Sequence, residues 1–296
     1  MASYLRSLTS GLVGVLIASA NIAAQGQAPQ SLPKGAPTEV TNIRINAGQA
    51  VVPYYEGWVR NADGSFDLVF GYFNRNWKEE IAIPVGPDNK FEPGNPDGGQ
   101  PTYFMPRRQR WIVRYHVPSD FGKKTVTWSI TANGRPEKAY GDLLPAQELT
   151  ERVLMTNGSF DPGEDDPNKP PTLNVTPPQG VTAGVPVKLT ASGSDDGLPK
   201  PRPVAAPPPP PPAGRGGAPI AQVNSSGGGR QVGLRMSWLQ IRGPGKVTFA
   251  APGPTMAVNG ETSTNATFAL PGTYVLRAFA TDGQLTTRKD ITVTVK

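Results

Sequence analysis

The sequence predicts an all-β protein built from two β-sandwich domains. The chain has 34 glycines and 34 prolines in 296 residues, a content that favours turns and short strands. No central segment keeps the i, i+3, i+4, i+7 apolar spacing of an amphipathic helix. Short runs of alternating apolar and polar residues instead recur between turn signals, as they do in sandwiches.

The N-terminus predicts export. Residues 1–24 have a single early charge at Arg6, the apolar run GLVGVLIASA over 11–20 and small residues at the end, which is the plan of a cleaved signal peptide. An uncleaved anchor is the alternative, but the run is short for a membrane span. A linker over 25–40 follows, and we expect no transmembrane segment in the mature chain. The chain has no cysteine, so an exported product fits the bacterial cell envelope, secreted or periplasmic.

Residues 41–155 are predicted to form an aromatic-rich β-sandwich. Asp63-Gly64 and Asn133-Gly134 are hairpin-turn dipeptides. The segments PYYEGW, GYFNRNW and GQPTYFMPRRQR resemble a group of uncharacterised exported bacterial proteins, which implies an envelope location and no activity. The expected strands are 58–60, 65–74, 80–85, 110–117, 124–131 and 138–143.

An acidic, proline-rich linker over 156–171 leads to a second unit at 172–296. Within that unit, residues 198–230 hold six consecutive prolines and two glycine-rich runs. We expect this insert to be disordered, as either a ligand for a partner or a tolerated low-complexity loop. The expected strands are 171–176, 185–193, 234–241, 246–250, 262–270, 273–280 and 286–295.

Three segments of the second unit carry a family resemblance. VKLTASGSDDG, GLRMSWLQIRGPGKVTF and NATFALPGTYVLRAFATDG, followed by DITVTV, resemble a PKD-type or related immunoglobulin-like domain. The resemblance covers most of 172–296 and implies the sandwich fold. It is weak on function, and the long insert departs from the family pattern.

Exposed aromatic residues are the first candidate binding site. Sugar rings stack on Trp and Tyr, so Tyr54, Tyr55 and Trp77 at strand edges are candidates for contact with a carbohydrate. The alternative is that they belong to the core, as we expect for Phe66, Phe70 and Tyr72, because a domain without disulfides needs large buried rings.

Arg107, Arg108 and Arg110 form the densest basic cluster of the sequence. Guanidinium groups match carboxylate and phosphate geometry, so the cluster suits an anionic polysaccharide, a lipid headgroup or an acidic partner. A solvated loop with internal ion pairs is the alternative. Nucleic acid is not expected as a partner of an exported protein.

Calcium is the one cofactor that the sequence suggests. Asp195 and Asp196 end one strand of the second unit, and Asp282 ends another. Loops at the same end of an immunoglobulin-like sandwich bring such residues together, and hard cations bind carboxylate oxygens. Ordinary Asp-Gly turns are the alternative.

No catalytic motif is present, and His116 is the only histidine. We therefore expect a non-catalytic binding or structural module of the envelope, of protein–protein or adhesion type, whose partner is an envelope protein or a glycan. An accessory carbohydrate-binding protein is the alternative, and a weak glycan-active enzyme is a third.

Overall fold

The computed structural model describes residues 44–156, 163, 165–200 and 233–296. The predicted signal peptide, the linker over 25–40 and most of the insert lie outside these residues. Residues from Arg44 to Lys296 group into one compact unit. Nearly all of the regular secondary structure in the described part of the chain is strand, so the predicted all-β fold class is confirmed.

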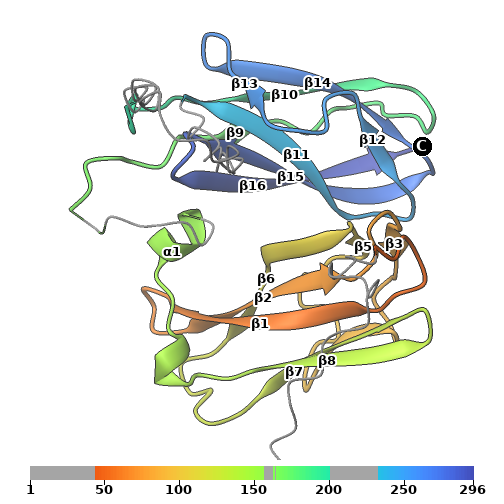
Figure 1. Ribbon diagram of the computed structural model, residues 1–296, viewed down its shortest axis with the longest axis vertical. Helices are drawn as coiled ribbons and strands as arrows, with labels where there is room; N and C mark the ends of the chain where they lie inside the picture. The colour runs from red at the N-terminus through yellow and green to blue at the C-terminus, as the bar shows by residue number, and fades with distance from the viewer. Residues whose placement is uncertain (1–43, 157–162, 164, 201–232) are drawn as a thin grey trace, which may run out of the picture. The chain divides into compact units, whose positions relative to one another are not determined.

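The first sandwich packs a three-stranded sheet, β1-β2-β6, against a second one, β4-β7-β8, with β3 and β5 paired beside them (Figure 1). Both larger sheets are antiparallel. The strands are β1 (Val51–Arg60), β2 (Phe66–Asn74), β3 (Ile81–Ala82), β4 (Asn89–Glu92), β5 (Tyr103–Phe104), β6 (Arg107–Val117), β7 (Val126–Ala132) and β8 (Arg135–Gly141).

Aromatic rings fill the core between these sheets. Phe70 is fully buried and contacts Tyr55, Phe91 and Trp128 at centroid distances of 5.2, 5.3 and 6.1 Å. Edge-to-face pairs of this kind add to the free energy gained by burying the rings. The prediction that Phe66 and Phe70 belong to the core is therefore confirmed.

Turn chemistry sets the register of the hairpins. Gly64 has φ +86°, and Asp63 Oδ1 accepts hydrogen bonds from the backbone N–H and hydroxyl of Ser65. Asn133 and Gly134 both have positive φ, 51° and 71°, as a two-residue turn between β7 and β8 requires. Both predicted hairpins are present.

The structure has more elements in the first unit than the sequence predicts. Strands β4 and β5 lie in the proline- and glycine-rich segment 86–109, where only a long loop was expected. A 3₁₀ turn, η1 (Pro145–Gln147), and a short helix, α1 (Glu151–Met155), follow β8. The helix begins at Thr150, whose hydroxyl accepts a bond from the N–H of Val153.

The second sandwich has two four-stranded sheets, ordered β12-β14-β10-β9 and β13-β11-β15-β16 (Figure 1). All seven expected strands are found, and the short strand β13 was not expected. The strands are β9 (Asn174–Val175), β10 (Val187–Ser192), β11 (Arg235–Arg242), β12 (Val247–Phe249), β13 (Thr255–Met256), β14 (Glu261–Phe268), β15 (Gly272–Thr281) and β16 (Thr286–Val295).

The last strand of this sandwich is held on two sides. β16 pairs with β15 along its whole length. Val181 forms a parallel bridge to Val295, and the Lys296 N–H donates to the Val181 carbonyl at 2.9 Å. Tyr274, Leu276, Ala278 and Ala280 of β15 are all fully buried, so the period-two pattern marks the core-facing side.

Polar contacts join the two sandwiches within this unit. Arg242 pairs with Asp97 at 2.5 Å, and Lys246 pairs with Glu80 at 2.7 Å. The Thr102 N–H donates to the Ile241 carbonyl at 3.1 Å. Ile241 of β11 is buried among the core residues of the first sandwich. The two sandwiches therefore share a packed boundary as well as these polar contacts.

No helix among residues 44–156, 163, 165–200 and 233–296 has the length and apolar character needed to cross a membrane.

Candidate functional site

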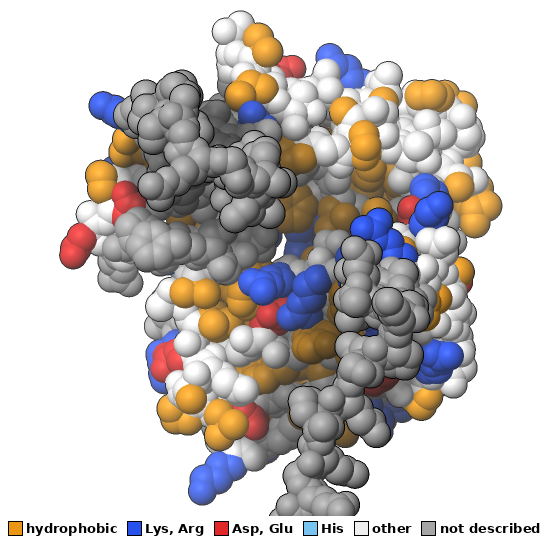
Figure 2. Space-filling model, viewed as in Figure 1, with side chains coloured by type: hydrophobic (Ala, Val, Ile, Leu, Met, Phe, Trp, Pro, Cys, Tyr) orange, Lys and Arg blue, Asp and Glu red, His pale blue; other side chains and the backbone are white. Residues whose placement is uncertain are grey.

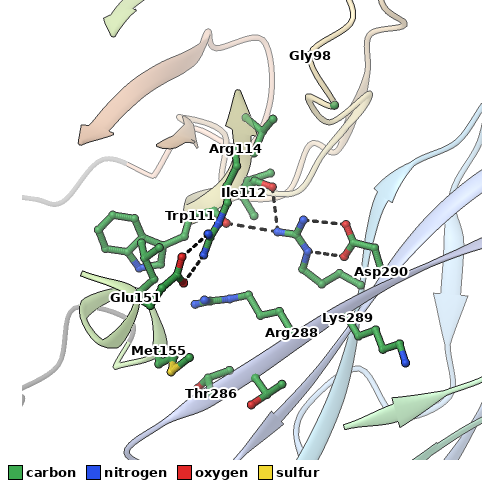
Figure 3. A pocket seen from close by; sticks show the side chains of 15 residues that line it. Gly98, Trp111, Ile112, Arg114, Glu151, Met155, Thr286, Arg288, Lys289 and Asp290 are labelled. Carbon is green, nitrogen blue, oxygen red and sulfur yellow. Dashed lines mark hydrogen bonds and ion pairs between the residues drawn. The ribbon is translucent and has the colours of Figure 1, made fainter. Parts of the chain in front are cut away.

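The candidate site is a cleft of about 690 Å³ that residues of both sandwiches line. Strand β6 and helix α1 supply one side, and strands β15 and β16 supply the other (Figure 3). A neighbouring hollow of about 480 Å³ shares three of its residues, Ile112, Thr286 and Arg288. We call the two together the arginine cleft, because five arginines line it: Arg108, Arg110, Arg114, Arg277 and Arg288.

Arg114 and Glu151 form one wall of the cleft. Nη1 and Nη2 of Arg114 donate to Oε1 and Oε2 of Glu151 at 2.5 and 2.7 Å (Figure 3). The hydrogen bonds to Glu151 raise the pKa of Arg114. Glu151 holds this position because Thr150 caps α1 and sets where the helix begins.

Arg277 fixes the opposite wall and reaches across to the first sandwich. Its Nε and Nη2 donate to Asp290 at 2.6 and 2.9 Å. Its Nη1 donates to the backbone carbonyls of Ile112 at 2.9 Å and Trp111 at 3.3 Å. Trp111 has φ +55°, and this irregular backbone lies where β6 departs from regular pairing with β2.

Arg288 differs from Arg108, Arg114 and Arg277, each of which pairs with a carboxylate. It extends from β16 into the cleft, half-buried, and has no carboxylate within ion-pair distance among the residues that the structure describes (Figure 3). Burial, followed by the positive charges of Arg277 and Arg114, lowers the pKa of Arg288 to about 10. The guanidinium is thus poorly solvated, and the attraction of Glu151, which already bonds to Arg114, does not offset the burial and the two positive charges.

The charge of the arginine cleft is strongly uneven. Six basic side chains line it, the five arginines and Lys289, against two acidic ones, Glu151 and Asp290. Figure 2 shows that Lys and Arg side chains also gather on the displayed face, with few acidic side chains among them. Apolar surface from Trp238 and Phe279 borders the smaller hollow. This combination suits a ligand with an anionic group and an apolar part.

Two of the predicted aromatic contacts are partly exposed, but an arginine covers each ring. Tyr54 is 41% exposed and Trp77 is 38% exposed. The guanidinium of Arg108 lies 4.2 Å from the Tyr54 ring centre, and that of Arg107 lies 4.2 Å from the Trp77 ring centre. Such cation–π stacking occupies ring surface that a sugar would use.

Tyr55 differs from the other two candidates. Its ring packs on Phe70, and its hydroxyl donates to the Asp142 carbonyl. Burial raises the pKa of Tyr55. Tyr55 therefore contributes to the core of the first sandwich rather than to an open surface.

The predicted arginine cluster divides in the structure. Arg108 and Arg110 line the smaller hollow together with Arg288, whereas Arg107 stacks on Trp77 and does not line it. Arg108 Nη2 pairs with Glu56 at 2.6 Å, and its buried Nη1 has no hydrogen-bond partner among the described residues. Burial raises the pKa of Glu56, against the lowering effect of Arg108 and Arg110.

The three aspartates proposed for a metal do not act as one set. Asp196 accepts backbone N–H bonds from Lys169 at 2.9 Å and Leu198 at 2.9 Å. The charges of Asp282 and Asp196 both act on Asp195, whose Oδ2 accepts the Gly197 N–H at 3.0 Å. Across the described ranges, no group of three or more His, Cys, Asp or Glu side chains could hold a metal ion.

His116 lies outside the arginine cleft. It is exposed, and its Nδ1 lies 3.1 Å from Asp67 Oδ1. Ser65, the serine of the β1–β2 hairpin, bonds to Asp63 and Asn61. The structure therefore does not join His116 and Ser65 into a nucleophilic pair.

Sequence reasoning did not identify Arg277 and Arg288, which come from adjacent strands far from residues 107–110. One signal was available. Val275 and Phe279 flank Arg277 on the side of β15 that faces away from its own core. Apolar residues on both sides of a strand indicate that both sides are covered, and Val275 indeed packs against the first core.

No protein-family model matches the chain, and no curated protein matches it. Among solved structures, a conjugative transposon lipoprotein from Bacteroides eggerthii is similar at 13% identity and a TM-score of 0.26, over 42% of this chain and 96% of that one. Fibronectin(III)-like modules of Clostridium thermocellum CbhA are similar at 11% identity and a TM-score of 0.24, over 87% and 92%. Domains 4 and 5 of the S-layer protein SbsC are similar at 10% identity and a TM-score of 0.23, over 83% and 98%. Scores this low carry no argument about function, and the PKD type of the second unit stays a resemblance.

Proposed function

We propose that this protein is a non-catalytic, exported binding module of the bacterial envelope whose ligand presents a carboxylate, phosphate or sulfate group to the arginine cleft. The partner is an envelope protein or a glycan that carries such a group. The observation that carries the proposal is Arg288, a half-buried guanidinium with no carboxylate partner among the described residues.

The physical reason is the free energy lost when the Arg288 guanidinium is removed from water without a bonded carboxylate. A guanidinium removed from water loses solvation, and an anion restores it through two parallel hydrogen bonds. Arg277 and Arg114 add positive charge near Arg288, while their own carboxylate partners keep them in place. The walls of the cleft are therefore set before a ligand arrives, which lowers the ordering cost of binding.

The acids of the cleft support a binding role over catalysis. An arginine holds Glu151 through two hydrogen bonds, and another holds Asp290 in the same way. General acid–base work needs a carboxyl group that is free to reach the substrate. The acids of this cleft therefore do not support a glycan-active enzyme.

The accessory carbohydrate-binding role stays a prediction. A sugar stacking on Tyr54 or Trp77 would compete with the guanidinium already on the ring. An anionic glycan does not need those rings, because the arginine cleft offers the charges that it would meet.

The test is titration calorimetry of the whole chain with polygalacturonate, a carboxylate polymer, and with dextran sulfate, with neutral dextran as the blank. We expect binding of one or both charged polymers, weakened about tenfold in Arg288→Gln, which corresponds to one lost charge-assisted interaction. Arg75→Gln is the matched control, because Arg75 is exposed and outside the cleft.

Equal affinity of the wild-type chain and Arg288→Gln would overturn the proposal. So would equal weakening by Arg288→Gln and Arg75→Gln, because that result indicates diffuse charge attraction rather than a site. Both titrations are repeated at raised salt, since attraction between exposed charges is screened more strongly than a pair inside a cleft.

A further inference from the structure

Three polar side chains of the linker and the second sandwich have buried atoms that find no hydrogen-bond partner among the described residues. They are Asp195 Oδ1, Asp282 Oδ2 and both amide atoms of Asn168. Asp282 is 0% exposed and Asn168 is 3% exposed. Buried polar atoms are paired in the great majority of cases, so three such side chains in one region need an explanation.

The chain brings these side chains to one place. Asp195 follows β10 and Asp282 follows β15, and the charge of Asp282 acts on Asp195. Asn168 lies between two anchored neighbours in the linker. The Lys169 N–H donates to Asp196 Oδ2 at 2.9 Å, and Asp166 Oδ2 accepts from Gln284 Nε2 at 2.6 Å. The linker is thus bonded on one side to the residue after Asp195 and on the other to a residue two positions after Asp282.

The surroundings leave the free oxygens available. Asp282 Oδ1 already accepts the backbone N–H groups of Gln284 at 2.5 Å and Leu285 at 2.7 Å, so only Oδ2 is free. Asp195 Oδ2 accepts the Gly197 N–H at 3.0 Å, which leaves Oδ1. Each aspartate therefore uses one oxygen for its turn and keeps the other.

We propose that Asp195 Oδ1, Asp282 Oδ2 and Asn168 Oδ1 are side-chain ligands of a calcium ion that joins the 156–171 linker to the second sandwich. Two carboxylates balance the charge of a divalent cation, and a neutral amide oxygen is a common third ligand of calcium. Backbone carbonyls and water complete such a site. The proposal differs from the sequence expectation in one member, because Asn168 takes the place of Asp196.

Oxygen-only ligands select the metal. Zinc prefers nitrogen and sulfur ligands, and neither histidine nor cysteine belongs to this group. Magnesium demands near-ideal octahedral geometry and releases its water reluctantly, whereas calcium accepts irregular sets of six to eight oxygens. Ligands that come from a linker and from two separate turns form an irregular set of this kind.

The alternative occupant is a proton. Burial, followed by a smaller effect of the Asp282 and Asp196 charges, raises the pKa of Asp195. A carboxyl group that is protonated at Asp195 would donate to a free oxygen and need no metal. The two explanations predict opposite results when calcium is added at neutral pH, so one experiment separates them.

The experiment is thermal unfolding of the whole chain after treatment with EDTA, in neutral buffer, with added calcium or magnesium. A calcium Kd on the order of 10⁻⁴ M is typical of extracellular modules, and millimolar calcium should then raise Tm by about 2–5 °C. Magnesium should give less. Titration calorimetry of the same sample should give a stoichiometry near one ion per chain.

Two variants and one control locate the site. Asn168→Ala and Asp195→Asn should each weaken calcium binding about tenfold or more, because each removes a ligand. Asp165→Asn removes a charge from the same linker at an exposed position and should leave calcium binding unchanged. In calcium-free buffer, Asp195→Asn should unfold at the same temperature as the wild type or higher, because it removes a partly buried negative charge that Asp282 and Asp196 repel.

No heat and no change in Tm with millimolar calcium would overturn the proposal and favour a protonated carboxyl group at Asp195. Equal weakening by Asp165→Asn would also overturn it, because calcium would then be attracted by the acidic linker as a whole. If Asn168→Ala does not fold, the wild-type titration and Asp195→Asn still decide the question. The arginine cleft has no part in these measurements.

Discussion

At the level of single residues, Asn89 shows how a polar side chain is accommodated in an apolar core. Asn89 is fully buried, yet each of its amide hydrogen-bonding groups has a partner. Its Oδ1 accepts from Trp128 Nε1 at 3.0 Å, and its Nδ2 donates to the carbonyls of Ile83 at 3.0 Å and Pro101 at 2.8 Å. One side chain therefore fixes β7 and the loops before β4 and β5.

We expect Asn89→Asp to lower the free energy of unfolding by about 3 kcal/mol, because the carboxylate can accept from Trp128 but faces two carbonyl oxygens without a donor. Denaturant unfolding followed by tryptophan fluorescence measures the loss. Asn95→Asp is the control, since Asn95 is exposed.

The same variant has a signature in pH. Burial raises the pKa of the introduced carboxyl group above its unfolded value, so the folded state binds the proton more tightly. The stability deficit of Asn89→Asp should therefore shrink as pH falls through that raised pKa. A deficit that does not change with pH would contradict this explanation.

At the level of elements, the close approach of the Thr172 backbone to the end of β10 decides which glycine tolerates a side chain. A Cβ atom on Gly193 would lie 2.0 Å from the Thr172 carbonyl oxygen and 3.3 Å from Met236 Cε. A Cβ on Gly180 would meet nothing within 4 Å, although Gly180 has φ +67°. The first position is limited by space and the second only by backbone conformation.

Gly193→Ala should therefore cost about 2–3 kcal/mol, because the backbone at Thr172 has to move away from the end of β10. Gly180→Ala should cost about 1 kcal/mol, the price of a left-handed conformation for alanine. Paired denaturant curves test the difference. Equal losses of unfolding free energy in the two variants would show that the backbone at Thr172 is free to shift.

The elements that sequence predicted best were those with a clear period. Tyr274, Leu276 and Ala278 alternate without a break, so β15 was found within a residue or two. Strands β4 and β5 were not predicted, because Pro93 and the glycines around them are typical of loops. Helix α1 was not predicted either, since five residues are too few to show a helical period.

At the level of the whole molecule, a polar boundary connects the two sandwiches. Arg242 donates to both oxygens of Asp97 at 2.5 and 3.1 Å and to the Gln100 carbonyl at 2.8 Å. The hydrogen bonds from Arg242 are the largest cause that lowers the pKa of Asp97. This boundary was hidden from sequence reasoning, because it joins residues about 145 positions apart.

The lowered pKa of Asp97 fixes the sign of an acid effect. Its folded pKa lies below the unfolded value of about 3.9, so the pair stabilises the fold above that pH and the contribution is lost as pH falls through the folded pKa. Asp97→Asn should lower Tm above about pH 4 and should match the wild type at lower pH. Melts across this range test it, with exposed Asp88→Asn as the control. A gap that persists in acid would contradict the prediction.

The arginine cleft was accessible to sequence reasoning only in part. Arg108 and Arg110 were chosen because they are close in sequence, and that choice included Arg107, which the structure places elsewhere. Arg277 and Arg288 lie at alternate positions of strands, where a charged residue usually marks a solvated side. These sides of β15 and β16 line a cleft only because the first sandwich packs beside them.

The parallel bridge between Val181 and Val295 has a mechanical consequence. If tension acts between the linker and Lys296, the segment at Val181 and the end of β16 are pulled along each other, and the hydrogen bonds between them have to break together rather than one after another. Resistance to force is a matter of the unfolding rate, not of equilibrium stability. Measured by single-molecule pulling, the second sandwich should therefore bear load better than its thermal stability alone suggests.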